Sequence, residues 1–174
     1  MDKYIVIING TGGSGKDSFV EFVSKYNKVV NVSSVDKVKD IATLMGWDGG
    51  KTEKDRKFLS DLKKLATDYN EMPLRDMKEK VEKFKESDNE IMFLHIREPE
   101  EIQKAVDIFG AITLLIRREG HKTITSNYSD ASVENYNYDY IITNSTLEKL
   151  EEDAKNFYQK ISNNKTYGYT ITGE

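Results

Sequence analysis

Apolar residues are concentrated in five short runs, separated by longer stretches in which apolar positions recur every three or four residues. The runs cover residues 4–8, 28–32, 90–96, 111–116 and 138–144. Runs of this length that are almost continuously apolar are typical of strands buried on both faces of a parallel sheet. Their alternation with helical periodicity predicts an α/β fold with three layers, in which a five-stranded parallel sheet carries helices on both faces.

The segment between the second and third runs contains more helix than a simple crossover needs. We expect a helix that Ser34 caps and that ends at Met45 before Gly46, followed by helices over 52–69 and from Pro73. The third of these begins at a proline, which suits a first helical turn. The chain is therefore expected to form a single domain over residues 1–174, with a helical insertion at about 47–88.

Length and composition restrict the class of protein. A chain of 174 residues can bury a sizeable core, and its net charge of −4 argues against a nucleic-acid-binding surface. The absence of Cys excludes disulfides, thiol catalysis and cysteine zinc sites. The sequence shows neither an apolar run long enough for a membrane span nor a signal peptide, so we expect a cytoplasmic protein, either a monomer or a homodimer.

A glycine-rich segment joins the first apolar run to the first helix. It has the spacing G-x-x-x-x-G-K and comprises Gly10, Thr11, Gly12, Gly13, Ser14, Gly15, Lys16, Asp17 and Ser18. Glycines let the backbone approach a ligand closely, and successive N–H groups at a helix N-terminus can then surround phosphates. The segment therefore predicts an ATP-binding phosphate loop, with Lys16 reaching the β- and γ-phosphates during catalysis.

Asp17 stands where this motif usually has Ser or Thr, whose hydroxyl binds Mg²⁺. A carboxylate is a hard oxygen ligand, so Asp17 and the neighbouring Ser18 are candidate ligands of Mg²⁺. The alternative is that Asp17 only stabilises the helix N-terminus by its charge.

Three segments resemble parts of phosphate-transferring enzymes. Gly15-Lys16-Asp17-Ser18 resembles the Gly-Lys-Asp-Thr of phage-type deoxynucleoside monophosphate kinases and, more weakly, the Ser-Gly-Lys-Asp of animal-type phosphomevalonate kinases. Residues 33–39 are similar to the Ser-Phe-Ala-Asp-Pro-Leu-Lys of the deoxynucleotide kinases, and Asp36 and Lys39 match its Asp and Lys. The resemblance implies that both bind the acceptor. A simple helix cap is the alternative for this segment.

The third segment, residues 95–101, is similar to the Asp-Val-Arg-Phe-Pro-Asn-Glu of the same kinases. Arg97, Pro99 and Glu101 match, whereas His95 replaces the family's Asp. An arginine at this position would bind a phosphate through two parallel hydrogen bonds, which makes Arg97 a candidate for both acceptor binding and catalysis. His95 is either a hydrogen-bonding partner of the acceptor or a structural histidine of the core.

The resemblance also assigns roles outside these segments. It places acceptor binding in the helical insertion, where Lys51 and Arg56 are candidates, although a solvated charged face is the alternative. It places a phosphate-covering lid at about residues 117–137, so that Arg117 and Arg118 are candidate catalytic cations; a basic surface turn is the alternative. Finally, it places Asn144 near the adenine.

Taken together, the resemblance implies a P-loop NTPase-type kinase that uses ATP and Mg²⁺. Its acceptor would be a small phosphorylated molecule, most readily a (deoxy)nucleoside monophosphate. A phosphomevalonate-type kinase is one alternative. A nucleotide-binding regulator without turnover is another, and the presence of His95 and the unusual residue after Lys16 support it.

Overall fold

The computed structural model describes residues 2–120 and 132–166, with side chains described as far as residue 163. Its centre is a sheet whose five strands are all parallel and follow the order β2-β3-β1-β4-β5. The strands are β1 (Tyr4–Asn9), β2 (Val29–Ser33), β3 (Ile91–His95), β4 (Ile112–Arg118) and β5 (Tyr140–Asn144). The predicted fold, a five-stranded parallel sheet covered on both faces, is confirmed.

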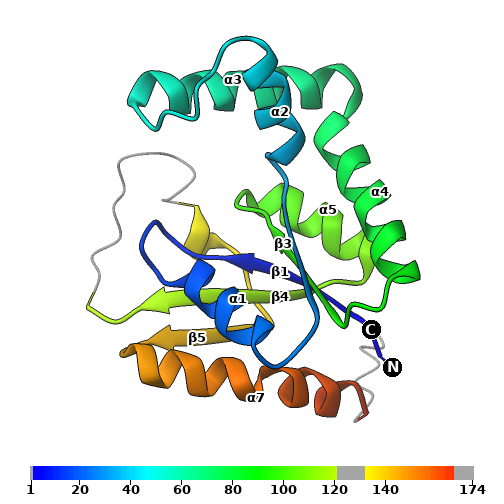
Figure 1. The fold of residues 1–174 in the computed structure, drawn as a ribbon, viewed down its shortest axis with the longest axis vertical. Coiled ribbons are helices and arrows are strands. Elements are labelled where there is room, and N and C mark those ends of the chain that lie inside the picture. The colour runs from blue at the N-terminus through cyan, green and yellow to red at the C-terminus, as the bar shows by residue number, and fades with distance from the viewer. Residues whose placement is uncertain (1, 121–131, 167–174) are drawn as a thin grey trace.

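Helices cover the two faces of the sheet and extend beyond one end of it (Figure 1). They are α1 (Lys16–Ser24), α2 (Asp36–Leu44), α3 (Glu53–Asn70), α4 (Met72–Glu86), α5 (Pro99–Phe109) and α7 (Leu147–Thr166), with a short 3₁₀ helix at Val133–Asn135. Helices α1 and α7 pack on one face, and α4 and α5 pack on the other.

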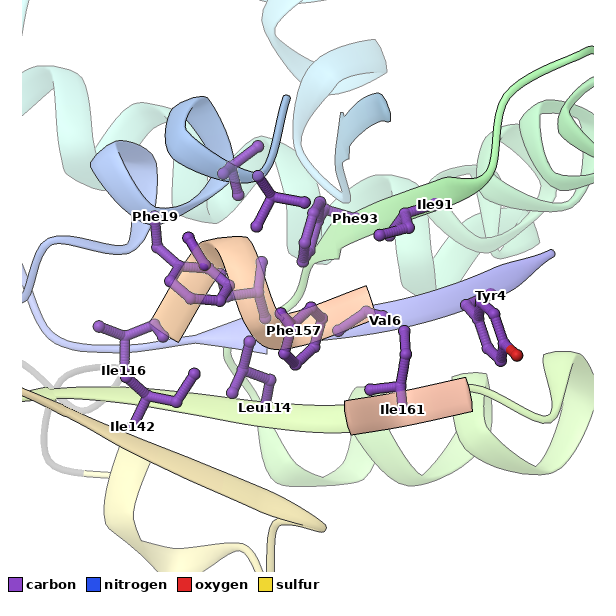
Figure 2. Packing of buried hydrophobic residues seen from close by; sticks show 14 of the residues in the cluster. Tyr4, Val6, Phe19, Ile91, Phe93, Leu114, Ile116, Ile142, Phe157 and Ile161 are labelled. Atoms are coloured by element: carbon purple, nitrogen blue, oxygen red, sulfur yellow. The ribbon is translucent and has the colours of Figure 1, made fainter. Parts of the chain in front are cut away.

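Side-chain alternation along the strands separates two hydrophobic cores. Val6 and Ile8 of β1 join the core under α1 and α7, whereas Ile7 between them joins the core under α4 and α5. In the first core, Phe19 meets Phe157 edge to face with ring centroids 5.4 Å apart, and Phe93 lies beside both (Figure 2). Burial on both faces gives the strands a rigid frame, from which their carboxyl ends present the residues of the site.

Helices α2, α3 and the start of α4 form an arm at one end of the sheet (Figure 1). Helix α3 begins with a capping box, in which the Thr52 side chain accepts from the N–H of Asp55 and the Asp55 carboxylate accepts from the N–H of Thr52. Thr52 is therefore the N-cap of α3. Within α3 itself, the structure contains no fully buried residue.

The expected cap of α2 is wrong. Val35 is the N-cap, and no side-chain hydrogen bond caps the helix there. Instead, Asp36 opens the helix and its carboxylate accepts from the backbone N–H of Ser33 at 2.8 Å. The turn into α2 is thus held by a carboxylate in the first helical turn, where the helix dipole also favours it.

Candidate active site

The strands deliver the candidate residues to one edge of the sheet. Because all five strands are parallel, their carboxyl ends meet there, and ligands of open α/β sheets bind at this edge. Residues far apart in sequence are level in the register: Ser33 of β2 pairs with His95 of β3, and Arg118 of β4 pairs with Asn144 of β5.

The glycine-rich loop leaves β1 and needs glycine at two positions. A Cβ on Gly10 would lie 2.7 Å from the carbonyl oxygen of Ile116, which is backbone and cannot easily move. Gly15 has φ = 96°, and a Cβ there would lie 2.4 Å from Nδ2 of Asn144. By contrast, a Cβ on Gly12 would meet nothing within 4 Å. A side chain at the first or the last glycine of the motif would collide with neighbouring atoms, so both positions require glycine.

Side chains of β4 and β5 form hydrogen bonds with the backbone of the loop. Asn144 donates to the carbonyl of Ser14 at 3.0 Å, and Arg118 donates to the carbonyl of Gly13 at 3.2 Å. The Ser14 hydroxyl is buried and has no hydrogen-bond partner within the described part of the chain. An unmet buried hydroxyl costs about 1–3 kcal/mol. The space bordered by the loop fits a phosphate group, whose oxygen would accept a hydrogen bond from the Ser14 hydroxyl.

Lys16 and Asp17 follow the loop at the first turn of α1 and differ sharply in exposure. The Lys16 side chain is 15% exposed and that of Asp17 is 85% exposed, with Nζ and Oδ1 3.8 Å apart. A carboxylate that projects into solvent beside the loop can reach a metal ion bound with a ligand. Both residues line two separate clefts, one on each side of α1's start.

The smaller cleft, of about 350 Å³, lies on the β4–β5 side of the loop. Its lining residues are Gly13, Gly15, Lys16, Asp17, Ser18, Arg118, Asn144, Ser145, Thr146 and Leu147. The structure thus brings the predicted ATP-binding residues Ser18 and Asn144 to one space together with the predicted catalytic residue Arg118. Asn144 contributes by holding the loop backbone, as well as by lining the cleft.

The larger cleft, of about 860 Å³, lies between the loop and the arm. Four predicted acceptor-binding residues line it, and they come from three parts of the chain: Asp36 and Lys39 of α2, Arg56 of α3, and Arg97 beyond β3. Lys51, the fifth candidate, is exposed and is not among the lining residues. Asp36 and Arg97 are 61 residues apart in the sequence, and the sheet and the arm bring them to one cleft.

His95 lies at the end of β3, among charged residues of both clefts. Its Nε2 is 2.6 Å from Oδ1 of Asn31, so the ring N–H donates to the amide oxygen. Burial lowers the pKa of His95 most; Lys16 and Arg97 lower it further, and Asp17 and Asp36 raise it. At neutral pH the ring is therefore an uncharged hydrogen-bonding group.

The two consecutive arginines of β4 point in opposite directions. Arg118 reaches the phosphate loop, whereas Arg117 donates through Nε to Glu134 at 3.0 Å, and this pair raises the pKa of Arg117. Successive strand residues alternate between faces, which explains the divergence. Of the predicted lid, residues 121–131 lie outside the described part of the chain. The described structure thus brings Arg118 to the loop and leaves Arg117 on the other side of the strand.

Asn9 is a structural link that the sequence reasoning missed. Its Nδ2 donates to the carbonyl of Arg97 at 3.1 Å and to the Tyr138 hydroxyl at 2.8 Å, while its Oδ1 accepts from the N–H of Gly10 at 2.9 Å. One buried amide therefore joins the phosphate loop to the backbone that carries Arg97. The only sequence signal is a polar residue at the end of an apolar strand.

Comparisons with known proteins identify the fold. The structure resembles that of TT1252 from Thermus thermophilus at a TM-score of 0.54 and 15% identity, over 99% of this chain and 100% of that one. It resembles a sugar kinase from Janibacter sp. HTCC2649 at a TM-score of 0.54 and 16% identity, over 93% and 96% of the two chains. A shikimate kinase from Aquifex aeolicus vf5 gives 0.48 and 12%, over 94% and 99%.

The likenesses above a TM-score of 0.5 show the P-loop NTPase-type fold, which the sugar kinase shares. No protein-family model matches the sequence, and no curated protein does. Among the described helices, none is long and apolar enough to cross a membrane. The described residues also contain no group of three or more His, Asp or Glu side chains placed to hold a metal ion by themselves.

Proposed function

We propose that the protein is an ATP-dependent kinase that transfers the γ-phosphoryl group of ATP to a small phosphorylated acceptor. The observation that carries the proposal is the position of Lys16 and Asp17 between two clefts. One cleft is formed by a phosphate-cradling loop, and the other is lined by Arg56 and Arg97. A transferring phosphoryl group needs cations on both its donor and acceptor sides, and this arrangement supplies them.

The proposed reaction needs positioning and charge more than proton transfer. An oxygen of the acceptor's phosphate forms a bond to the γ-phosphorus of ATP, the bond from that phosphorus to the β-phosphate oxygen breaks, and ADP leaves with the electron pair. A phosphate acceptor is already ionised, so no general base is required. Lys16, Arg118 and Arg97 would stabilise the negative charge spread over the transferring group.

The residues beside the loop fit a magnesium ion. Mg²⁺ is usually held by one or two carboxylates together with substrate phosphates and water, so the lack of a larger acidic cluster among the described residues is compatible with it. Asp17 and Ser18 would hold the ion, which would neutralise phosphate charge when bound. His95, kept neutral by burial, would leave Asp17 as the carboxylate of this site.

For the acceptor, a (deoxy)nucleoside monophosphate is the first candidate. The support is that Asp36, Lys39 and Arg97, the residues that match the deoxynucleotide kinases, line one cleft with Lys16. Arg97 and Arg56 would bind its phosphate, and Asp36 would accept a hydrogen bond from a sugar hydroxyl or base amine. A phosphomevalonate-type acceptor is the second candidate. Arg56 and Arg97 would bind its phosphate in the same way.

The deciding experiment measures ADP formation with MgATP and a panel of nucleoside monophosphates and aliphatic phosphates. We expect one class of acceptor to be turned over, and we expect Lys16→Ala to lower that rate by at least about a hundredfold. Lys25→Ala is the matched control, because Lys25 follows the other end of α1 and pairs with Glu151 at 2.7 Å. Turnover of Lys16→Ala at the wild-type rate, or wild-type nucleotide binding without turnover of any acceptor, would contradict the proposal.

A further inference from the structure

Lys63 forms ion pairs that join α3 of the arm to the start of α5, beside the larger cleft. Its Nζ lies 3.0 Å from Oε2 of Glu98 and 2.7 Å from Oε2 of Glu101. Lys63 is in the middle of α3, whereas the two glutamates flank the start of α5. Its side chain is only 12% exposed, so these bonds are shielded from solvent far more than an ordinary surface ion pair.

Other lysines of α3 behave differently. Lys57 pairs with Asp61 and Lys64 pairs with Asp68, in each case four residues away on the same helix. Their side chains are 75% and 76% exposed. Such pairs stabilise a helix by a few tenths of a kcal/mol and fix nothing outside it. Lys63 therefore connects two elements, and its neighbour Lys64 does not.

The two glutamates depend on the ammonium between them. Burial opposes ionisation of Glu98, but Lys63 outweighs it, so the pKa of Glu98 is lowered. Burial, with the nearby Glu98 carboxylate, raises the pKa of Glu101 against the same ammonium. Removing the ammonium would leave two half-buried carboxylates facing each other, and the turn that carries them would have to move.

Helix geometry connects this ion pair to the acceptor side of the site. Arg56 and Lys63 are seven residues apart, which is close to two turns of α3, so both side chains project from the same face. On the other side, Arg97 immediately precedes Glu98. All four residues line the larger cleft. The Lys63–Glu98 pair therefore sets how far α3, which carries Arg56, stands from the turn that carries Arg97.

We propose that Lys63 is a positioning residue of the kinase: it ties α3 to the start of α5, so that Arg56 and Arg97 face one acceptor phosphate. The inference rests on the proposed function for its kinetic consequence, since it assumes that the acceptor occupies the larger cleft. The tether itself does not depend on turnover. Because α3 contains no fully buried residue, we expect its position to respond when the tether is removed.

The kinetic test compares Lys63→Met, Lys63→Arg and the control Lys64→Met, with Arg97 and Arg56 unchanged. We expect Lys63→Met to lower kcat/KM for the acceptor by about tenfold and to change KM for ATP by less than twofold. Lys63→Arg should restore most of the loss, because it keeps the cation, and Lys64→Met should match wild type. A lower melting temperature of Lys63→Met with an unchanged KM for the acceptor would reduce Lys63 to a structural role and overturn the inference.

A second measurement separates the tether from the proposed function. Hydrogen–deuterium exchange followed by mass spectrometry reports on peptides from α3 and from residues 96–101 in the whole protein. We expect both peptides to exchange faster in Lys63→Met than in Lys64→Met, with α1 unchanged. Faster exchange in a protein that turns over no acceptor would reject the proposed function and retain the tether. Equal exchange in the two variants would reject the tether.

Discussion

The phosphate loop and the arm face each other across Lys16, yet they are held in place by different forces. The loop is fixed by close contacts: it leaves a buried strand, two of its glycines leave no room for a side chain, and its carbonyls accept hydrogen bonds from the side chains of Arg118 and Asn144. Within the arm, α2 and α4 bury apolar side chains, whereas α3 contains no fully buried residue and is tied to α5 through the ion pairs of Lys63. The helix that carries Arg56 is therefore held less by core packing than the phosphate loop is.

This difference indicates which side can move. Close backbone contacts have few alternative arrangements, so the loop is already formed for a phosphate. A helix without a fully buried residue opens more readily than a packed core, so we expect α3 to be the more mobile side. The proposed kinase would hold ATP in a fixed geometry and would close on a second substrate, and a firmly held loop beside a more mobile α3 would serve both.

The largest effect is expected from an added methyl group on the loop. Gly15→Ala places a Cβ 2.4 Å from Nδ2 of Asn144 and forces alanine to keep φ at 96°. Because the loop's backbone must shift, we expect ATP affinity to fall by at least about a hundredfold, equivalent to roughly 2.7 kcal/mol. Gly12→Ala should change it by less than threefold, since its Cβ meets nothing within 4 Å. Calorimetric titration with ATP checks both variants, and equal affinities would show that the loop is not fixed by its glycines.

The sequence predicted the loop well, because every feature it needs lies within ten residues. The spacing of Gly10, Gly15 and Lys16 between a strand and a helix is a local pattern, and in the structure these residues do join β1 to the first turn of α1. The opposite directions of Arg117 and Arg118 were missed for a related reason. The fourth strand was expected to end at Ile116, but β4 continues to Arg118, and strand alternation therefore still applies to both arginines.

The residues of the larger cleft were predicted only in part, because the cleft depends on contacts between distant segments. Asp36 and Arg97 were predicted through resemblance to known segments, and the structure places both at one cleft. Lys63 looked like any charged residue on a helix, and its role appears only when Glu98, 35 residues later, lies beside it. Asn9 meets Arg97 across 88 residues. Periodicity identifies helices and strands, but it carries no information about such pairs.

A smaller effect, confined to the other substrate, is expected when Arg97 is removed. Arg97→Ala should lower kcat/KM for the acceptor by about tenfold, the equivalent of about 1.4 kcal/mol, because the guanidinium would bind the acceptor's phosphate. KM for ATP should change by less than twofold. Arg75→Ala is the control, since Arg75 is exposed on α4 and does not line the cleft. Initial rates with each substrate varied in turn decide the matter, and a loss confined to ATP would move Arg97 to the donor side.

The smallest predicted effect is on the pH dependence of the free energy of unfolding. It involves His95, which lies between the phosphate loop and the larger cleft. His95 lies among Lys16 and Asp17 from the loop side and Asp36 and Arg97 from the acceptor side, and burial is the main reason its pKa lies below the ordinary 6.5. The folded protein therefore binds less proton at His95 than the unfolded chain does. Stability from this group is fully present above pH 6.5 and is lost as pH falls below it, because the unfolded chain takes up the proton first.

The replacement His95→Gln removes this titration while keeping a side-chain N–H that can donate to Asn31. Between pH 7.5 and 5.5, we expect wild type to lose more free energy of unfolding than the variant does. The difference can be at most about 1.4 kcal/mol per pH unit, the value for one proton. Urea unfolding at both pH values measures it, and carboxylates that titrate in both proteins cancel in the comparison. Equal losses would mean that His95 is protonated as readily in the folded protein as in the unfolded chain. The surroundings of His95 would then tolerate a positively charged ring, which would contradict the inference that burial favours the neutral ring.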